Sequence, residues 1–236
     1  MTIHHPDHAA PPRHRWVWAL ALSPVLLVLN WFFARSDSVG LLGRLDTWSV
    51  VSGPELDARL AFVVSFLLLG GISALAAYPI YGRRPHELGL GLGDARRGLA
   101  LLAIGIPLAL LAAYLSAEPG GPLAAVYPLH RGLTRAAGSF VPFALLYGLY
   151  YLGFEYHFRG FLLLGLAERL GPAAANVLQA GLVTLVHVGK PGIELAAAFP
   201  ASLAFGWVTL RTRSIWYALL IHAAVGWGLD WLLLAG

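Results

Sequence analysis

The stretch SFVPFALLYGLYYLGFEYHFRGFLLLGLAERL, from Ser139 to Leu170, decides the fold class of this chain. Its 32 residues would form a straight helix about 48 Å long, whereas the hydrocarbon core of a bilayer is about 30 Å thick. Apart from Glu168 and Arg169 near its end, the stretch is apolar except near its middle, where EYHFR carries Glu155, His157 and Arg159. A charge at the bilayer centre costs at least about 2.5–3.5 kcal/mol, so such residues face the protein interior and by default mark a functional site. The stretch therefore predicts a tilted or projecting membrane helix with ionisable groups inside the protein.

The rest of the chain is similarly apolar. Hydrophobic residues make up 58% of the 236 residues and charged residues 12%, and the mean hydropathy is +0.69. A soluble domain of this length needs more surface charge, and the apolar runs are continuous rather than alternating, which argues against a β-barrel. Seven such runs occur, at residues 16–34, 59–81, 98–117, 139–168, 172–190, 195–211 and 214–235. We predict an all-α, polytopic membrane helix bundle with about seven transmembrane helices.

The domain organisation is simple. Residues 1–15 are polar and rich in His and Pro, which predicts a disordered tail. The apolar run that begins at Trp16 is too long and too rich in Trp for a signal-peptide core, so we interpret it as a retained membrane helix. Without an internal repeat or a soluble second domain, residues 16–236 are predicted to form one integral-membrane domain.

The charged residues indicate topology rather than nucleic-acid binding. The net charge of +4 comes from 15 Arg and one Lys against 12 acidic residues, and no basic stretch is dense enough for nucleic acid. If the N-terminus is cytoplasmic, nine Arg lie in inside segments, against five Arg and one Lys in outside segments. This bias predicts a cytoplasmic N-terminus. The Ala-, Gly- and Arg-rich composition suggests a bacterium with GC-rich DNA, and hence the bacterial inner membrane.

The absence of Cys excludes disulfides, thiolate zinc sites and cysteine nucleophiles.

Glu155 and Arg159 are the first candidate site residues. They stand four residues apart, so they share a helix face and can pair. One interpretation is a structural ion pair that joins helices. The other is that Arg159 keeps a catalytic Glu155 ionised despite burial. His157 points about 200° away from Glu155, so we do not expect it in the same site.

His187 and His222 lie on two other predicted helices. His187 ends the run GLVTLVH, and His222 lies two turns into the last apolar run. Each has a plain structural interpretation, as a capping histidine and as a packed histidine bonded to a neighbouring helix. Glu155 and His187 are both about 21 Å from the cytoplasmic ends of their helices. We therefore expect Glu155, His187 and His222 to converge in one intramembrane cavity.

Two further acidic residues have simpler interpretations. Glu194 follows KPG and is expected in the first turn of the sixth helix, where the helix dipole favours a negative charge. Asp230 lies eight residues after His222, about 12 Å along the axis, and a solvated position near the outer interface is at least as plausible as a functional one.

A carboxylate with two imidazoles has two possible uses. The carboxylate and one imidazole can activate a water as general base, while the second imidazole donates a hydrogen bond to the oxyanion of an attacked amide. The same trio, Glu155, His187 and His222, could instead bind zinc. The zinc-protease motif HExxH is absent, since His86-Glu87 has no second His at the required spacing. We therefore expect no cofactor and keep zinc as the alternative.

The motifs resemble those of the CPBP family, the CAAX proteases and bacteriocin-processing enzymes. FEYHFRGF matches part of the family motif EExxxR at Glu155, Arg159 and Gly160, VTLVH supplies the histidine of FxxxH at His187, and HAAVG supplies His222. The resemblance extends over roughly residues 85–235, with the catalytic core at about 139–235. It implies a glutamate-type intramembrane endopeptidase that cleaves a membrane-associated peptide or protein near its terminus, with Glu155 activating water and the two histidines assisting. Its partners would be that substrate and the lipid bilayer.

The chain departs from the family pattern at two positions. Phe154 stands where the family has the first Glu of EExxxR, and Gly226 stands four residues after His222, where the family has Asn or Asp. Two alternatives therefore stay open. One is a catalytically degenerate relative that acts as a membrane scaffold, chaperone or immunity factor. The other is a small transporter that uses Glu155 as an ion or proton site.

Overall fold

The computed structural model describes residues 14–34, 54–130 and 132–235, and these residues contain helices and no strand. The predicted tail at residues 1–15 lies outside this part of the chain except for its last two residues. Seven apolar helical segments are present at the predicted places. They are α1 (Val17–Phe33), α3–η2–α4 (Pro54–Ser65, Phe66–Gly71, Ile72–Tyr81), α5 (Ala95–Ser116), α6–η4–α7 (Ala137–Glu155, Tyr156–Leu164, Gly165–Leu170), α8 (Pro172–Val186), α9 (Gly192–Thr212) and α10 (Trp216–Leu233).

Five of these segments are long and apolar enough to cross a membrane, namely Ala58–Tyr81, Ala95–Ser116, Ala137–Leu170, Gly192–Thr212 and Trp216–Leu233. The other two, α1 and α8, are apolar but shorter. Large apolar side chains on the outer faces of the long segments are exposed, for example Leu75 at 80% and Leu145 at 70%. Exposed apolar side chains on long apolar helices are typical of a surface that faces lipid. The chain is an integral membrane protein with a polytopic helix bundle.

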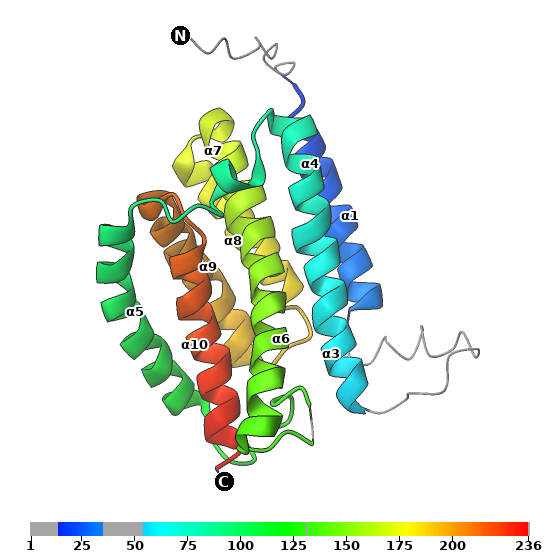
Figure 1. Cartoon of the computed structure of the whole chain (residues 1–236), viewed down its shortest axis with the longest axis vertical. Helices are drawn as coiled ribbons and strands as arrows, with labels where there is room; N and C mark the ends of the chain where they lie inside the picture. Colours follow the sequence, from blue (N-terminus) through cyan, green and yellow to red (C-terminus); the bar gives the residue numbers. More distant parts are fainter. Residues whose placement is uncertain (1–13, 35–53, 131, 236) are drawn as a thin grey trace, which may run out of the picture.

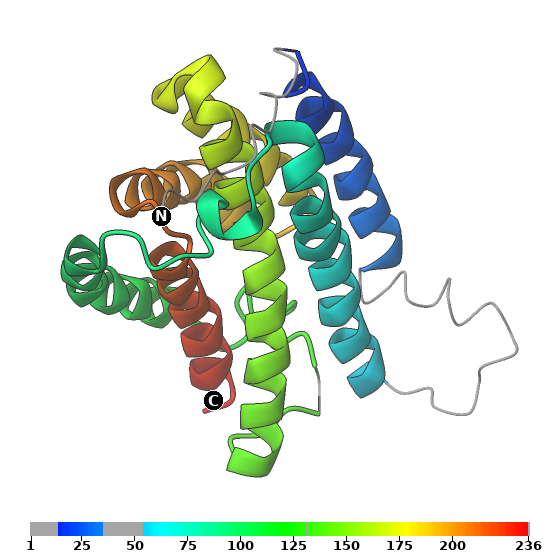
Figure 2. The same cartoon turned by 45° about the horizontal axis from the view of Figure 1, so that its top comes forward.

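The long helix α6 runs through the middle of the bundle (Figure 1). In both views α3 and α4 lie on one side of it with α1 beyond them, and α10 lies on the other side with α5 beyond it (Figures 1 and 2). The helices α8 and α9 pack against each other and lie behind α6. The helices that carry the predicted site residues are therefore neighbours, because α10 packs against α6, and α8 packs against η4, which continues α6.

The predicted long helix is confirmed, but its winding changes at Glu155. The α-helical part ends at Glu155 and the next nine residues, Tyr156–Leu164, form the π-helix η4. A second π-helical segment, η2, packs against α6 at two glycines, where a Cβ on Gly153 would lie 2.8 Å from the Phe66 Cα and one on Gly70 would lie 2.9 Å from the Gly153 Cα. Only glycine permits this approach of two backbones. The contact fixes the end of α6, and hence Phe154 and Glu155, against its neighbour.

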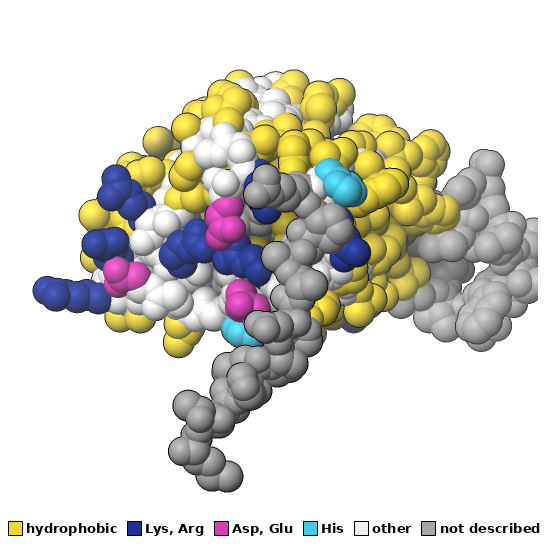
Figure 3. All heavy atoms as spheres, turned by 90° about the horizontal axis from the view of Figure 1, so that it is seen from above, with side chains coloured by type: hydrophobic (Ala, Val, Ile, Leu, Met, Phe, Trp, Pro, Cys, Tyr) yellow, Lys and Arg dark blue, Asp and Glu magenta, His cyan; other side chains and the backbone are white. Residues whose placement is uncertain are grey.

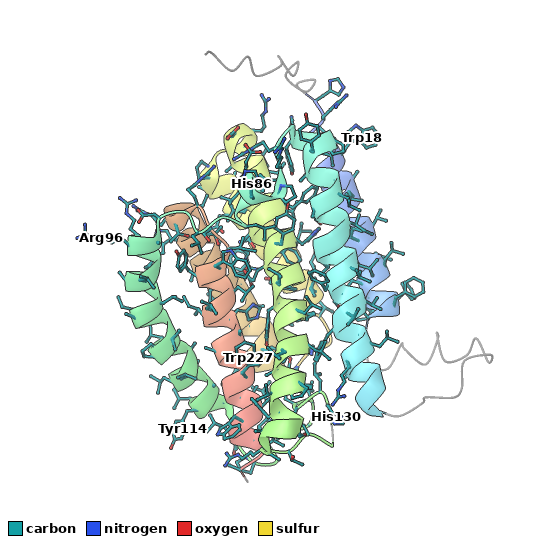
Figure 4. The ribbon with its side chains drawn as sticks, in the orientation of Figure 1. Trp18, His86, Arg96, Tyr114, His130 and Trp227 are labelled. Atoms are coloured by element: carbon teal, nitrogen blue, oxygen red, sulfur yellow. The ribbon has the colours of Figure 1, made fainter. Side chains whose placement is uncertain are left out.

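One end of the bundle carries a group of charged side chains, which Figure 3 shows from above. This end is formed where α4 ends and α5 begins, at α7, and at the α9–α10 connection (Figure 1). His86 and Arg96 mark it in Figure 4, while Tyr114 and His130 mark the opposite end. The sequence places seven arginines in these segments: Arg83, Arg84, Arg96, Arg97, Arg169, Arg211 and Arg213. By the positive-inside rule this end is predicted to be cytoplasmic.

Candidate active site

The Glu155 carboxylate lies between a guanidinium and an imidazole. Its Oε2 is 3.3 Å from Arg159 Nε, and its Oε1 is 2.7 Å from His222 Nδ1. The Glu155 and Arg159 side chains are 0% and 1% exposed. A buried carboxylate needs compensation of this kind, because an unpaired charge away from water is costly. The structure therefore brings together three of the four predicted site residues.

Arg159 is held by a polar network from two other helices. Its Nη2 donates to Ser202 Oγ on α9 at 3.0 Å, and Ser202 Oγ donates to Gln179 Oε1 on α8 at 3.1 Å. The Phe154, Phe158 and Phe205 rings lie 5.7–5.9 Å from its Cζ. These aromatic faces favour a cation beside them. The network fixes the position of the cation, which in turn fixes the Glu155 carboxylate.

His222 is held by Glu155 on one side and by aromatic rings around it. The Tyr151 ring centroid lies 4.6 Å from its own, and that of Phe205 lies at 5.4 Å. The His222 side chain keeps 22% of its surface exposed, whereas Glu155 has none. Nδ1 is directed at Glu155, so Nε2 is the nitrogen that remains available on the accessible side of the ring.

His187 ends α8 and belongs to a second polar cluster. Its Nδ1 donates to the Val183 carbonyl at 2.8 Å, and its Nε2 is 3.9 Å from Glu194 Oε1. Glu194 Oε1 accepts a hydrogen bond from the Tyr127 hydroxyl at 2.8 Å, and Lys190 Nζ donates to that hydroxyl at 3.1 Å. The predicted position of Glu194 in the first turn of α9 is confirmed. Its contact with His187 was not expected, because it crosses a turn that no hydropathy pattern describes.

Both clusters open into one cavity of about 950 Å³. Its polar lining includes Tyr127, His187, Lys190, Glu194 and His222, and much of the remaining lining is aromatic or aliphatic. Glu155 is not a lining residue, because His222 and Arg159 cover its carboxylate. The two histidines therefore line one cavity, as predicted. Glu155 does not line it and is connected to the cavity only through its contact with His222.

The two departures from the family motifs have structural counterparts. The Phe154 ring is buried, packs 4.6 Å from Phe158 between ring centroids, and lines the cavity. A Cβ on Gly226 would lie 1.8 Å from the Tyr151 hydroxyl oxygen. The Tyr151 hydroxyl thus occupies the space that a family Asn or Asp would need.

The other ionisable residues lie apart from these clusters. His157 Nδ1 is 2.8 Å from Ser73 Oγ and its side chain is buried, as expected for a residue on another helix face. Asp230 is 0% exposed rather than solvated. Within the described residues, no group of three or more His, Asp or Glu side chains is arranged to hold a metal ion. The zinc alternative stays a prediction.

The comparisons with known proteins agree with the motifs. A family model described as type II CAAX prenyl endopeptidase Rce1-like matches residues 136–228, from the start of α6 into α10. No curated protein and no solved structure matches the chain. The predicted resemblance to the CPBP family is confirmed over this region, which contains all four predicted site residues.

Proposed function

We propose that this chain, whose residues 136–228 match the Rce1-like endopeptidases, is an intramembrane endopeptidase that hydrolyses a peptide bond of a membrane-associated peptide or protein near its terminus. The matching family is a protease family. The observation that carries the proposal is the 2.7 Å contact between the buried Glu155 carboxylate and His222, beside the cavity of about 950 Å³. A carboxylate behind an imidazole orients the ring and favours its positively charged form, whose other nitrogen can donate a hydrogen bond to an oxyanion.

The two histidines differ in the groups behind them, and this difference supports a separate role for each. The Val183 carbonyl can only accept a hydrogen bond, so Nδ1 of His187 carries the proton and Nε2 of the neutral ring is an acceptor. The Glu155 carboxylate behind His222 can balance the charge of a doubly protonated ring, whose Nε2 then donates. We assign His187 to the attacking water and His222 to the oxyanion.

Glu155 receives a different role from the one that the motifs led us to expect. The sequence led us to place it on the water, but its oxygens face Arg159 and His222 and its side chain is fully buried. In this proposal Glu155 is a positioning residue that orients His222, and Arg159 is the buried cation paired with Glu155.

The reaction consumes one water for each bond broken. The water oxygen attacks the carbonyl carbon, and His222 Nε2–H stabilises the oxyanion that forms. The carbon–nitrogen bond then breaks, and the nitrogen receives the proton that the water lost on the His187 side of the cavity. The products are a new carboxyl terminus and a new amino terminus. An apolar cavity with a few directed polar groups suits an apolar peptide segment that enters from the bilayer.

The test compares the termini of membrane proteins in four strains: wild type, a deletion, Glu155→Gln and the control Glu118→Gln, which changes an exposed glutamate at the end of α5. We expect the same termini to disappear in the deletion and in Glu155→Gln, and to persist in the control. Termini that disappear in the deletion alone would show that Glu155 is not needed.

That second outcome would favour the catalytically degenerate relative. Phe154 and Gly226 are the observations in its support, because each replaces a polar residue of the family motif with one that cannot act on a proton. A protein of this kind would act as a scaffold, and its phenotype would survive Glu155→Gln.

A further inference from the structure

Peptide-bond hydrolysis in the cavity requires a general base that removes a proton from water. The motif position that supplies this base in the family carries no carboxylate here. Phe154 replaces the first motif carboxylate, and Glu155 is fully buried against Arg159 and His222. Among the cavity-lining residues in the described part of the chain, Glu194 is the one with a carboxylate. Its side chain is 20% exposed, close to the 19% of His187.

The distance between Glu194 and His187 is informative. At 3.9 Å, Glu194 Oε1 and His187 Nε2 are too far apart for a direct hydrogen bond. Both atoms are acceptors when the ring is neutral, because the His187 proton sits on Nδ1 and is donated to Val183. One water molecule fits between two acceptors at this separation and can donate a hydrogen to each. A water held this way keeps its lone pairs free for attack.

The surroundings keep the Glu194 carboxylate ready for this role. Burial holds the pKa of Tyr127 well above its usual range, so the phenol keeps its proton and donates it to Oε1. Glu194 Oε2 is also buried, and it accepts no hydrogen bond from the residues that the structure describes. The first turn of α9 stabilises a negative charge at this position. Oε1 is thus held in place by Tyr127 and lies on the side of His187 Nε2, so it is the oxygen that can take a hydrogen from the water.

We propose that Glu194 is the general base of the peptidase reaction and that it holds the attacking water together with His187. This inference rests on the endopeptidase function proposed above. Glu194 takes one proton from the water as the new carbon–oxygen bond forms. When the carbon–nitrogen bond breaks, the electron pair goes to nitrogen and Glu194 returns the proton there. His222 donates to the oxyanion from the opposite side, so the two clusters serve the two halves of one reaction.

The competing explanation is that Glu194 and Tyr127 only fasten the α8–α9 turn. This would make Glu194 a structural residue, and its loss would lower the melting temperature without a specific loss of turnover. The two explanations separate when rate and stability are measured on the same purified protein.

The experiment uses full-length protein in detergent with membranes from the deletion strain as substrate. The rate at which new termini appear is measured by mass spectrometry for wild type, Glu194→Gln, Glu194→Asp and the control Glu118→Gln. Removing a general base slows turnover by about 10²–10⁴-fold. We expect Glu194→Gln to lose at least about 100-fold with its melting temperature retained, Glu194→Asp to fall in between because a displaced carboxylate remains, and the control to match wild type.

The possible results separate the proposed endopeptidase function from the proposed role of Glu194. If wild-type protein produces no new termini, the proposed function fails and this inference falls with it. If wild type cleaves and Glu194→Gln cleaves at a similar rate, the function stands and the base is another group. Should Glu194→Gln fail to fold, Glu194→Asp decides, because a folded Asp variant with the wild-type rate contradicts a base that must reach the water.

Discussion

At the scale of single residues, the ionisable groups of the site fall into two sets, a buried pair and a set that is accessible from the cavity. Glu155 and Arg159 are almost fully buried and contact each other, and Glu155 also contacts His222. His222 and Glu194 each keep about a fifth of their side-chain surface accessible, 22% and 20%. In the reaction that we propose, the buried pair therefore acts through His222. A positioning role of this kind affects turnover more than substrate binding, because the substrate does not touch the buried pair.

The buried pair allows stability and activity to be separated. Glu155→Gln leaves Arg159 without its counter-charge, and breaking a buried pair costs about 3–5 kcal/mol. The double variant Glu155→Gln/Arg159→Met removes the orphaned charge, so we expect it to regain much of the lost melting temperature. Turnover should stay low in both variants while KM changes little, because neither variant keeps a negatively charged carboxylate behind His222. Recovery of turnover in the double variant would show that the pair is only structural.

Gly226 packs directly against the Tyr151 hydroxyl, which leaves no space for a side chain at position 226. A Cβ at this position would lie 1.8 Å from the Tyr151 hydroxyl oxygen and 3.0 Å from the ring carbon that bears it. We expect Gly226→Ala to lower the melting temperature, and Tyr151→Phe to relieve part of that loss in the double variant. Gly181→Ala is the matched control, because Gly181 also lies within a helix and has open space at its Cβ. A Gly226→Ala protein as stable as the control would contradict this packing.

At the scale of helices, the sequence predicts where elements lie better than how they wind. All seven apolar runs became helices, because a bilayer requires continuous apolar segments whose backbone bonds are satisfied internally. The π-helix after Glu155 was not foreseen, since the four-residue spacing of Glu155 and Arg159 suits an ordinary helix equally well. The contact between His187 and Glu194 was missed because it depends on the geometry of the turn between α8 and α9.

The contact between η2 and α6 is the element-scale feature most open to test. Gly153→Ala would place a methyl group 2.8 Å from the Phe66 Cα, a backbone atom that cannot rotate away. The helices must then separate, which moves Phe154 and Glu155. We expect lower thermal stability together with reduced turnover, against the control Gly181→Ala. Unchanged stability and turnover in Gly153→Ala would show that the helices tolerate separation.

At the scale of the whole molecule, the bundle has a charged end and an end with fewer basic groups. The charged end contains the α4–α5 and α9–α10 connections, and the other contains the α5–α6 connection (Figures 1 and 3). Hydropathy cannot orient a bundle, but the distribution of arginines can. The prediction is that the charged end and the N-terminus face the cytoplasm.

The absence of Cys from the chain makes this orientation simple to measure. An impermeant maleimide added to intact spheroplasts should label Glu118→Cys, at the end of α5, and should label Arg84→Cys only after lysis. Both positions are outside the helices, so the label reports the side of the membrane. The reverse pattern would invert the topology without altering the site.

The central claim is that water cleaves a peptide bond inside this bundle, in the cavity between His187 and His222. The most direct measurement is the mass of the product when purified protein acts on deletion-strain membranes in water enriched in the heavy oxygen isotope. We predict one heavy oxygen in each new carboxyl terminus, with product formation abolished in His222→Ala and retained in Glu118→Gln. New termini that appear equally in His222→Ala, or no new termini with wild-type protein, would contradict the account.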